Sequence, residues 1–178
     1  MSSIPHDIPP QTLKEFGTPR DNEERRDGGC AVAFDPISQK YAVGKDEVGG
    51  LLRLYSGGVD QDEDMEAGTL RELTEESGLH EFLHVEKIDE VLTHYRNQLK
   101  NVNRVAKATC FLVILRSADL VPVKHEEHEK FNLIWVSSQE ILDNWNARNQ
   151  KRDYDHWIYF LKKSVARAKE LGFDTTSI

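Results

Sequence analysis

The chain lacks the long apolar segments that mark membrane proteins. Its longest apolar run, residues 110–115, is far shorter than the roughly twenty residues of a membrane-spanning helix. Residues 1–20 contain prolines and mixed charges but no apolar stretch, so they do not resemble a secretory signal. The sequence has two cysteines, Cys30 and Cys110, and both lie in apolar segments. We therefore expect a cytoplasmic protein with two buried thiols, and a disulfide between them is the alternative.

Basic residues are outnumbered by acidic ones. The chain has 23 Lys and Arg against 31 Asp and Glu, and its formal net charge is −8. Proteins that coat nucleic acid or anionic membranes need clustered cations, so strong binding to either is not expected. An excess of carboxylates is instead compatible with binding of divalent cations. A length of 178 residues is typical of one domain, which can bury a core without a disulfide or zinc.

The sequence divides into two regions. Residues 1–27 contain four prolines and a charged run, which predicts a loose leader, and residues 28–178 are predicted to form one domain. Apolar alternation predicts strands, whereas apolar spacings of three and four predict helices. The order of elements indicates an α/β or α+β domain with a mixed sheet covered by helices. The expected strands lie near residues 30–34, 40–43, 51–55, 82–85, 91–96, 104–115 and 131–136, and the expected helices near residues 64–77, 139–145 and 154–171.

One predicted helix carries three clustered carboxylates. Glu72, Glu75 and Glu76 are spaced i, i+3 and i+4, so they share one helical face. Like charges at this spacing destabilise an isolated helix by roughly a few tenths of a kcal/mol per pair. Such a ridge suits a hard divalent cation such as Mg²⁺ or Mn²⁺, although a solvated acidic face is the alternative. Gly57 and Gly58 precede the helix, where a glycine turn can aim a backbone carbonyl at the same ion.

This segment resembles the Nudix box at every defined position. Nine specified positions within 23 residues make the motif specific. The resemblance by motif covers residues 57–79, the order of predicted strands is similar to a Nudix domain over roughly residues 28–172, and residues 1–27 are not covered. The match reads Gly57, five residues, Glu63, seven residues, Arg71-Glu72-Leu73, one residue, Glu75-Glu76, one residue and Gly78-Leu79.

The resemblance implies a fold and an activity. The fold is an α/β/α sandwich with a mixed β-sheet between helices. The activity is hydrolysis of a pyrophosphate bond in a nucleoside diphosphate linked to another moiety, with a nucleotide sugar, a dinucleoside polyphosphate, a nucleoside triphosphate or capped RNA as alternatives. A catalytically silent Nudix-fold nucleotide-binding module is the rival interpretation. Such modules usually lose carboxylates of the box, whereas all three are present here.

The resemblance also implies roles for individual residues. The three carboxylates resemble the family's ligands for Mg²⁺ or Mn²⁺, and a backbone carbonyl of Ser56 or Gly57 resembles a further ligand. Arg71 and Glu63 resemble the structural ion pair that holds the box together. In some members the general base comes from a loop outside the box, and here Glu127 is the first candidate for it, with its neighbours at positions 126 and 129 next. In other members the base is the residue that matches Glu72, so both assignments stay open.

Candidate substrate-binding residues lie on either side of the box. Tyr95, Arg96, Lys100 and Arg104 form a basic segment with one aromatic ring, in which Tyr95 can stack a base and the cations can bind phosphates. Ordinary surface charge on a hairpin is the alternative. Arg53, just before the box, is also predicted to bind substrate, together with Tyr95 and Arg96. The expected partner is a small nucleotide-type substrate, and a homodimer is left open.

Overall fold

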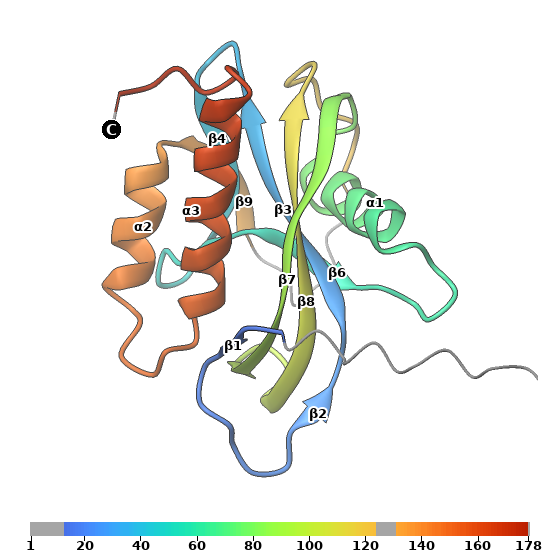
Figure 1. The fold of residues 1–178 in the computed structure, drawn as a ribbon, viewed down its shortest axis with the longest axis vertical. Helices are drawn as coiled ribbons and strands as arrows, with labels where there is room; N and C mark the ends of the chain where they lie inside the picture. The colour runs from blue at the N-terminus through green and yellow to red at the C-terminus, as the bar shows by residue number, and fades with distance from the viewer. Residues whose placement is uncertain (1–12, 124–130, 178) are drawn as a thin grey trace, which may run out of the picture.

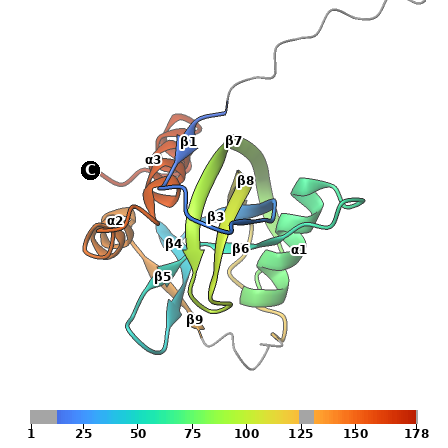
Figure 2. The same cartoon turned by 90° about the horizontal axis from the view of Figure 1, so that it is seen from below.

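The computed structural model describes residues 13–123 and 131–177. Within these residues a nine-stranded sheet lies between helices, with α1 on one face and α2 and α3 on the other (Figure 1 and Figure 2). The predicted mixed sheet between helical layers is confirmed. None of the helices in the described part is both long and apolar enough to cross a membrane.

The centre of the sheet is β3 (Gly28–Asp35). It pairs in parallel with β8 (Val102–Leu115) and antiparallel with β4 (Lys40–Asp46). All residues of β3 after Gly28 are buried, as expected for a strand covered on both faces. The remaining strands are β1 (Glu15–Phe16), β2 (Glu24–Arg25), β5 (Leu52–Arg53), β6 (Tyr55–Gly58), β7 (Phe82–Asn97) and β9 (Phe131–Val136).

The helix α1 (Met65–Ser77) has a capping residue at each end. The Asp64 carboxylate accepts a hydrogen bond of 3.0 Å from the backbone N–H of Ala67, and Gly78 ends the helix at a φ of 85°. Leu73 is fully buried against the apolar residues of β3 and β8 on this face. This packing sets the orientation of α1, so that Glu72 and Glu76 lie half-buried beside the packed face and Glu75 is exposed.

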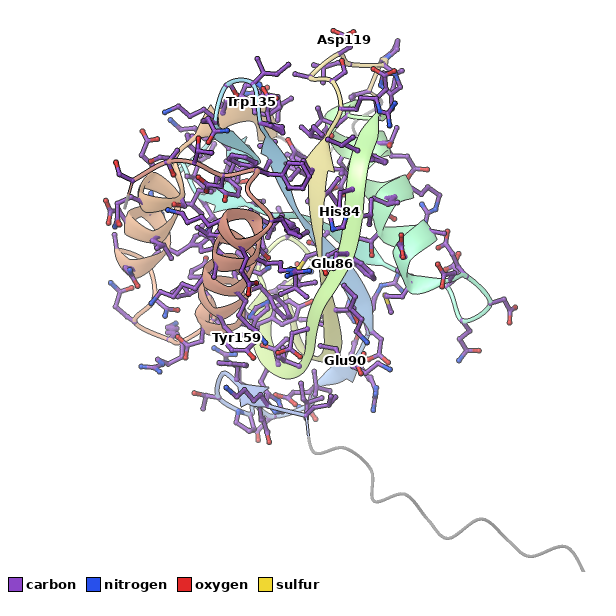
Figure 3. All side chains as sticks on the ribbon, turned by 45° about the horizontal axis from the view of Figure 1, so that its top comes forward. His84, Glu86, Glu90, Asp119, Trp135 and Tyr159 are labelled. Carbon is purple, nitrogen blue, oxygen red and sulfur yellow. The ribbon has the colours of Figure 1, made fainter. Side chains whose placement is uncertain are left out.

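The helices α2 (Ser138–Asn146) and α3 (Asp155–Glu170) cover the other face of the sheet. Two links tie α3 to the long strand β7. Arg167 of α3 binds Glu86 through two hydrogen bonds of 2.7 and 2.9 Å, and Tyr159 donates a hydrogen bond of 2.5 Å to Asp89. Glu86 and Tyr159 can be followed in Figure 3. These contacts hold α3 against β7 near both ends of the helix.

The N-terminal segment differs from the expected loose leader. From residue 13 onward it lies along the edge of the sheet, where β1 pairs in parallel with β7 and β2 pairs in parallel with β8. His94 of β7 further ties it down, because its ring nitrogens lie 2.6 Å from a Glu15 oxygen and 2.9 Å from Glu23. Strands of two residues carry no alternating pattern, so the sequence gives no sign of this pairing.

Two other expectations differ from the structure. The strands predicted at residues 82–85 and 91–96 are one continuous strand, β7, whose register shifts between Phe82 and His84 and again between Lys87 and Asp89. Such irregularities interrupt the two-residue alternation and make one strand resemble two. The strand predicted at residues 51–55 is divided between β5 and β6, and the turn expected at Gly57 and Gly58 is the end of β6, because both glycines pair with β3. Cys30 and Cys110 lie opposite each other in register as buried free thiols, without the alternative disulfide.

Candidate active site

A cavity of about 490 Å³ lies where β3, β6, α1 and the first turn of α3 meet. Four glycines line its middle and pair across the two strands, with Gly28 opposite Gly58 and Gly29 opposite Gly57. Because glycine has no side chain, this patch leaves the cavity open between the helix α1 and the opposite wall. The cavity therefore joins two groups of side chains from opposite faces of the sheet.

The first group is the set of carboxylates on α1. Glu72, Glu75 and Glu76 all line the cavity, as do Ser56 and Gly57 of β6. Glu72 is the most closely packed against β6, because a Cβ added at Gly57 would lie only 2.5 Å from its carboxylate carbon. Glycine is therefore required at position 57 for the carboxylate to lie against the backbone.

Arg71 binds the carboxylates around it. Its Nε and Nη2 donate hydrogen bonds of 2.8 and 2.9 Å to the two oxygens of Glu63, so the predicted ion pair is present. These hydrogen bonds lower the pKa of the Glu63 carboxyl. Arg71 Nη1 also donates to Glu72 at 3.2 Å and to Glu75 at 3.1 Å. One guanidinium thus relieves the repulsion among neighbouring carboxylates that the spacing on the helix creates.

The carboxylates form a ridge, and they do not form a closed metal cage. Across residues 13–123 and 131–177, no three His, Cys, Asp or Glu side chains are gathered closely enough to hold an ion as they stand. The donor set nevertheless fits Mg²⁺ or Mn²⁺, because it consists of oxygens on one helical face. The narrow space at Gly57, which a Cβ would fill, also places backbone beside the Glu72 carboxylate. The assignment of these residues as ligands stays a prediction.

The opposite wall of the cavity is aromatic and basic. Tyr95 of β7 stacks on His156 of α3, with ring centroids 5.9 Å apart and planes inclined by 29°. Burial lowers the pKa of His156 to about 4, so this ring is neutral at neutral pH. Ala106 and Ala108 of β8 lie on the same face of the strand as Arg104 and also line the cavity.

The three predicted substrate-binding residues all line this cavity, but two already have partners. Arg53 donates to both oxygens of Asp46 at 2.6 and 2.9 Å. Arg96 donates to Asn103 at 3.1 Å, and Tyr95 lies on the aromatic wall. The predicted bases Glu127, Glu126 and Glu129 lie outside the described residues.

Sequence reasoning missed two other groups of the cavity. Arg26 reaches it from the segment expected to be loose, and His156 reaches it from a helix expected only to pack on the sheet. Neither residue belongs to a recognisable motif. Their positions follow from the pairing of β2 with β8 and the docking of α3 on β7, which no local pattern encodes.

A carboxylate-bearing helix, held against the glycines of β6 beside a cavity in a mixed sheet, defines a Nudix-type domain. The model of the NUDIX domain matches residues 38–158, and the chain belongs to the Nudix family. No curated protein matches the chain by sequence.

Three solved structures illustrate the likeness of the fold. A NUDIX hydrolase from Listeria monocytogenes, described as putative, has a TM-score of 0.60 at 19% identity, covering 85% of this chain and 99% of its own. An Ap4A hydrolase binary complex from C. elegans has a TM-score of 0.57 at 16% identity, covering 82% and 98%. A MutT protein from Methanosarcina mazei has a TM-score of 0.56 at 18% identity, covering 83% and 98%. At these identities the likeness shows the fold alone.

Proposed function

We propose that this Nudix protein hydrolyses a pyrophosphate bond in a nucleoside diphosphate linked to another moiety, with Mg²⁺ or Mn²⁺. The observation that supports this most directly is the cavity, which joins the carboxylates of Glu72, Glu75 and Glu76 to an aromatic, basic wall. Membership of the Nudix family supports the reaction class. One protein of similar fold is named an Ap4A hydrolase, so a dinucleoside polyphosphate is a candidate substrate beside a nucleotide sugar and a nucleoside triphosphate.

The carboxylate ridge and the end of β6 beside it are the proposed metal site. Glu72, Glu75 and Glu76 supply carboxylate oxygens, and Ser56 or Gly57 supplies a backbone carbonyl. When bound, a divalent cation neutralises phosphate oxygens and lowers the pKa of a coordinated water. Arg71 holds Glu72 and Glu75 in place until then, through hydrogen bonds of 3.2 and 3.1 Å.

The remaining roles are to orient the substrate and to accept a proton. The Tyr95 ring offers a stacking surface for a base, and Arg53 and Arg96 lie where they can face phosphates. The attacking water must lose a proton, and Glu127 or Glu72 is proposed to accept it. A positioned base of this kind is typically worth about 10²–10⁴-fold in rate.

The test begins with purified protein and a panel of nucleoside diphosphate derivatives. Phosphate released after added phosphatase should report cleavage that requires Mg²⁺ or Mn²⁺ and stops with EDTA. Glu76→Gln keeps the size of the side chain but removes its charge, so turnover should vanish while the melting temperature is retained. A wild-type protein that binds nucleotides but cleaves none of them would instead be the silent binding module.

The base is assigned by comparing glutamine variants. Glu127→Gln should lower kcat by about 10²–10⁴-fold with Mn²⁺ affinity nearly unchanged, whereas Glu72→Gln should lower both. Glu126→Gln and Glu129→Gln are the matched controls from the same loop. If none of the loop variants loses more than a few-fold while Glu72→Gln loses thousands, the base is Glu72.

A further inference from the structure

Arg26 brings a cation into the cavity from outside the segment that the family model covers. The model matches residues 38–158, whereas Arg26 directly follows β2 near the N-terminus. Its backbone N–H donates a hydrogen bond of 3.1 Å to the carbonyl of Val105, which continues the pairing with β8. The pairing places the Arg26 side chain in the lining of the cavity.

The guanidinium of Arg26 lies directly on Gly58. A Cβ added at Gly58 would collide with its Nε, Cζ and Nη2 atoms, so the absence of a side chain at position 58 makes room for Arg26. Glu72 lies in the same way against the preceding residue, Gly57. The cation and the proposed metal ligand therefore contact neighbouring residues of β6 from the two opposite faces of the strand, and both side chains line the cavity.

Arg26 is not engaged by an acidic partner. Within the described part of the chain its side chain has no hydrogen bond or ion pair, whereas its neighbour Arg25 donates to Asp27 at 3.2 and 3.3 Å. A guanidinium is a rigid fork of donors that matches the oxygens of a phosphate. Its donors are thus available to a ligand in the cavity.

Two further groups lie near Arg26. Arg104 stands opposite Tyr95 in the pairing of β7 with β8, and its side chain is only 11% exposed. Its one carboxylate partner in the described residues is Glu24, at 2.9 Å, and that side chain is 61% exposed. Burial raises the pKa of the Tyr95 hydroxyl, and the charges of Arg104 and Arg26 act in the opposite direction, as expected if both cations lie close to it.

We propose that Arg26, Arg104 and the Tyr95 hydroxyl form an anion-binding corner that holds a substrate phosphate beyond those at the carboxylate ridge. The proposal rests on the proposed function, and it names the substrate class within it. A nucleotide sugar has two phosphates, which the metal site accounts for. A cationic corner in the same cavity, in addition to the metal site, therefore favours substrates with three or more phosphates.

The test compares Arg26→Ala with Arg25→Ala, which removes the same charge from the adjacent residue. For the wild type and both variants, kcat/KM is measured with diadenosine tetraphosphate, ATP and ADP-ribose. Arg26→Ala should lower kcat/KM for the polyphosphates by about 10–100-fold, the size of one or two charged hydrogen bonds, through KM. In the same variant kcat/KM for ADP-ribose should fall less than about threefold. Arg25→Ala should leave kcat/KM for all three substrates near the wild-type values. An equal loss on all three substrates, or no loss, overturns the proposal.

A second variant tests the placement of Arg26 without changing its charge. Gly58 does not have a positive φ, so Gly58→Ala strains the backbone little, but its methyl group must push the flexible guanidinium aside. Gly58→Ala should reproduce the loss on polyphosphates. The double variant, with Arg26→Ala and Gly58→Ala together, should have the same kcat/KM for polyphosphates as Arg26→Ala alone, because both changes remove the same contact. Additive losses in the double variant would contradict this geometry.

A binding measurement distinguishes the anion-binding corner from the proposed hydrolysis. Calorimetric titration with α,β-methylene-ATP and Ca²⁺ needs no turnover. If the wild type cleaves nothing but binds this analogue, and Arg26→Ala weakens binding at least tenfold while Arg25→Ala does not, the corner stands and the proposed hydrolysis fails. If the wild type cleaves polyphosphates and both arginine variants match it in binding and in kcat/KM, the corner fails and the hydrolysis stands.

Discussion

Replacing Gly57 by alanine should weaken metal binding through the position of one carboxylate. The added Cβ would lie 2.5 Å from the carboxylate carbon of Glu72, whereas ordinary contacts begin at 3.4 Å. The carboxylate must therefore move by about 0.9 Å, the difference between the two. Metal–ligand distances in well-formed sites lie within about 0.2 Å of standard values, so a displacement of this size disturbs coordination. We expect Mn²⁺ affinity to fall by about 10–100-fold, as when groups that orient a metal ligand are lost, with kcat lowered by about 10²-fold.

The measurement is a Mn²⁺ titration by electron paramagnetic resonance, with kcat and melting temperature determined on the same preparation. Gly57 does not have a positive φ, so alanine should leave the fold intact. Gly58→Ala adds the same methyl group one residue further on, where it meets Arg26 instead of Glu72, and it should leave Mn²⁺ affinity unchanged. Wild-type Mn²⁺ affinity and kcat in Gly57→Ala would refute the reasoning.

Two further predictions concern stability. Arg71→Ala should lower the melting temperature in EDTA, because Glu63 loses its partner, and Mn²⁺ should restore part of the loss by replacing the positive charge; an identical fall with and without Mn²⁺ would contradict this. Burial lowers the pKa of His94, but the hydrogen bonds that its ring donates to Glu15 and Glu23 outweigh this effect and raise the pKa above 6.5. The stabilisation is therefore complete below pH 6.5 and is lost as the pH rises through the raised value. The free energy of unfolding, measured with urea between pH 5 and 9, should show this loss in the wild type and little of it in His94→Gln. The same dependence on pH in both proteins would rule the prediction out.

The helix α1 could be predicted from the sequence because its determinants are local. Asp64 and Gly78 cap it by contacts within one turn of the chain, and Leu73 sets the buried face. The spacing of Glu72 and Glu76 then fixes both on one ridge. The general order of strands and helices followed from the same short-range periodicity.

The long strand β7 shows where such periodicity fails. Two shifts in register interrupt its alternation, so the sequence reads as two strands. The spacing of the carboxylates along the chain likewise does not encode which partner each of them contacts. Arg71 binds Glu63, eight residues away, and also Glu75, and this choice depends on how the loop before α1 folds back.

The sequence alone therefore determined the carboxylate ridge, the two glycines that precede it and the layered fold. Only the tertiary structure decided what faces the ridge across the cavity. Glu24 and Arg104 come together from positions 80 residues apart, and His156 reaches Tyr95 from the last helix. Sheet pairing uses backbone hydrogen bonds, which all residues except proline can form, so side chains do not specify which distant strand becomes the neighbour. That choice is made by burial of the whole core, and it places Arg26 on Gly58.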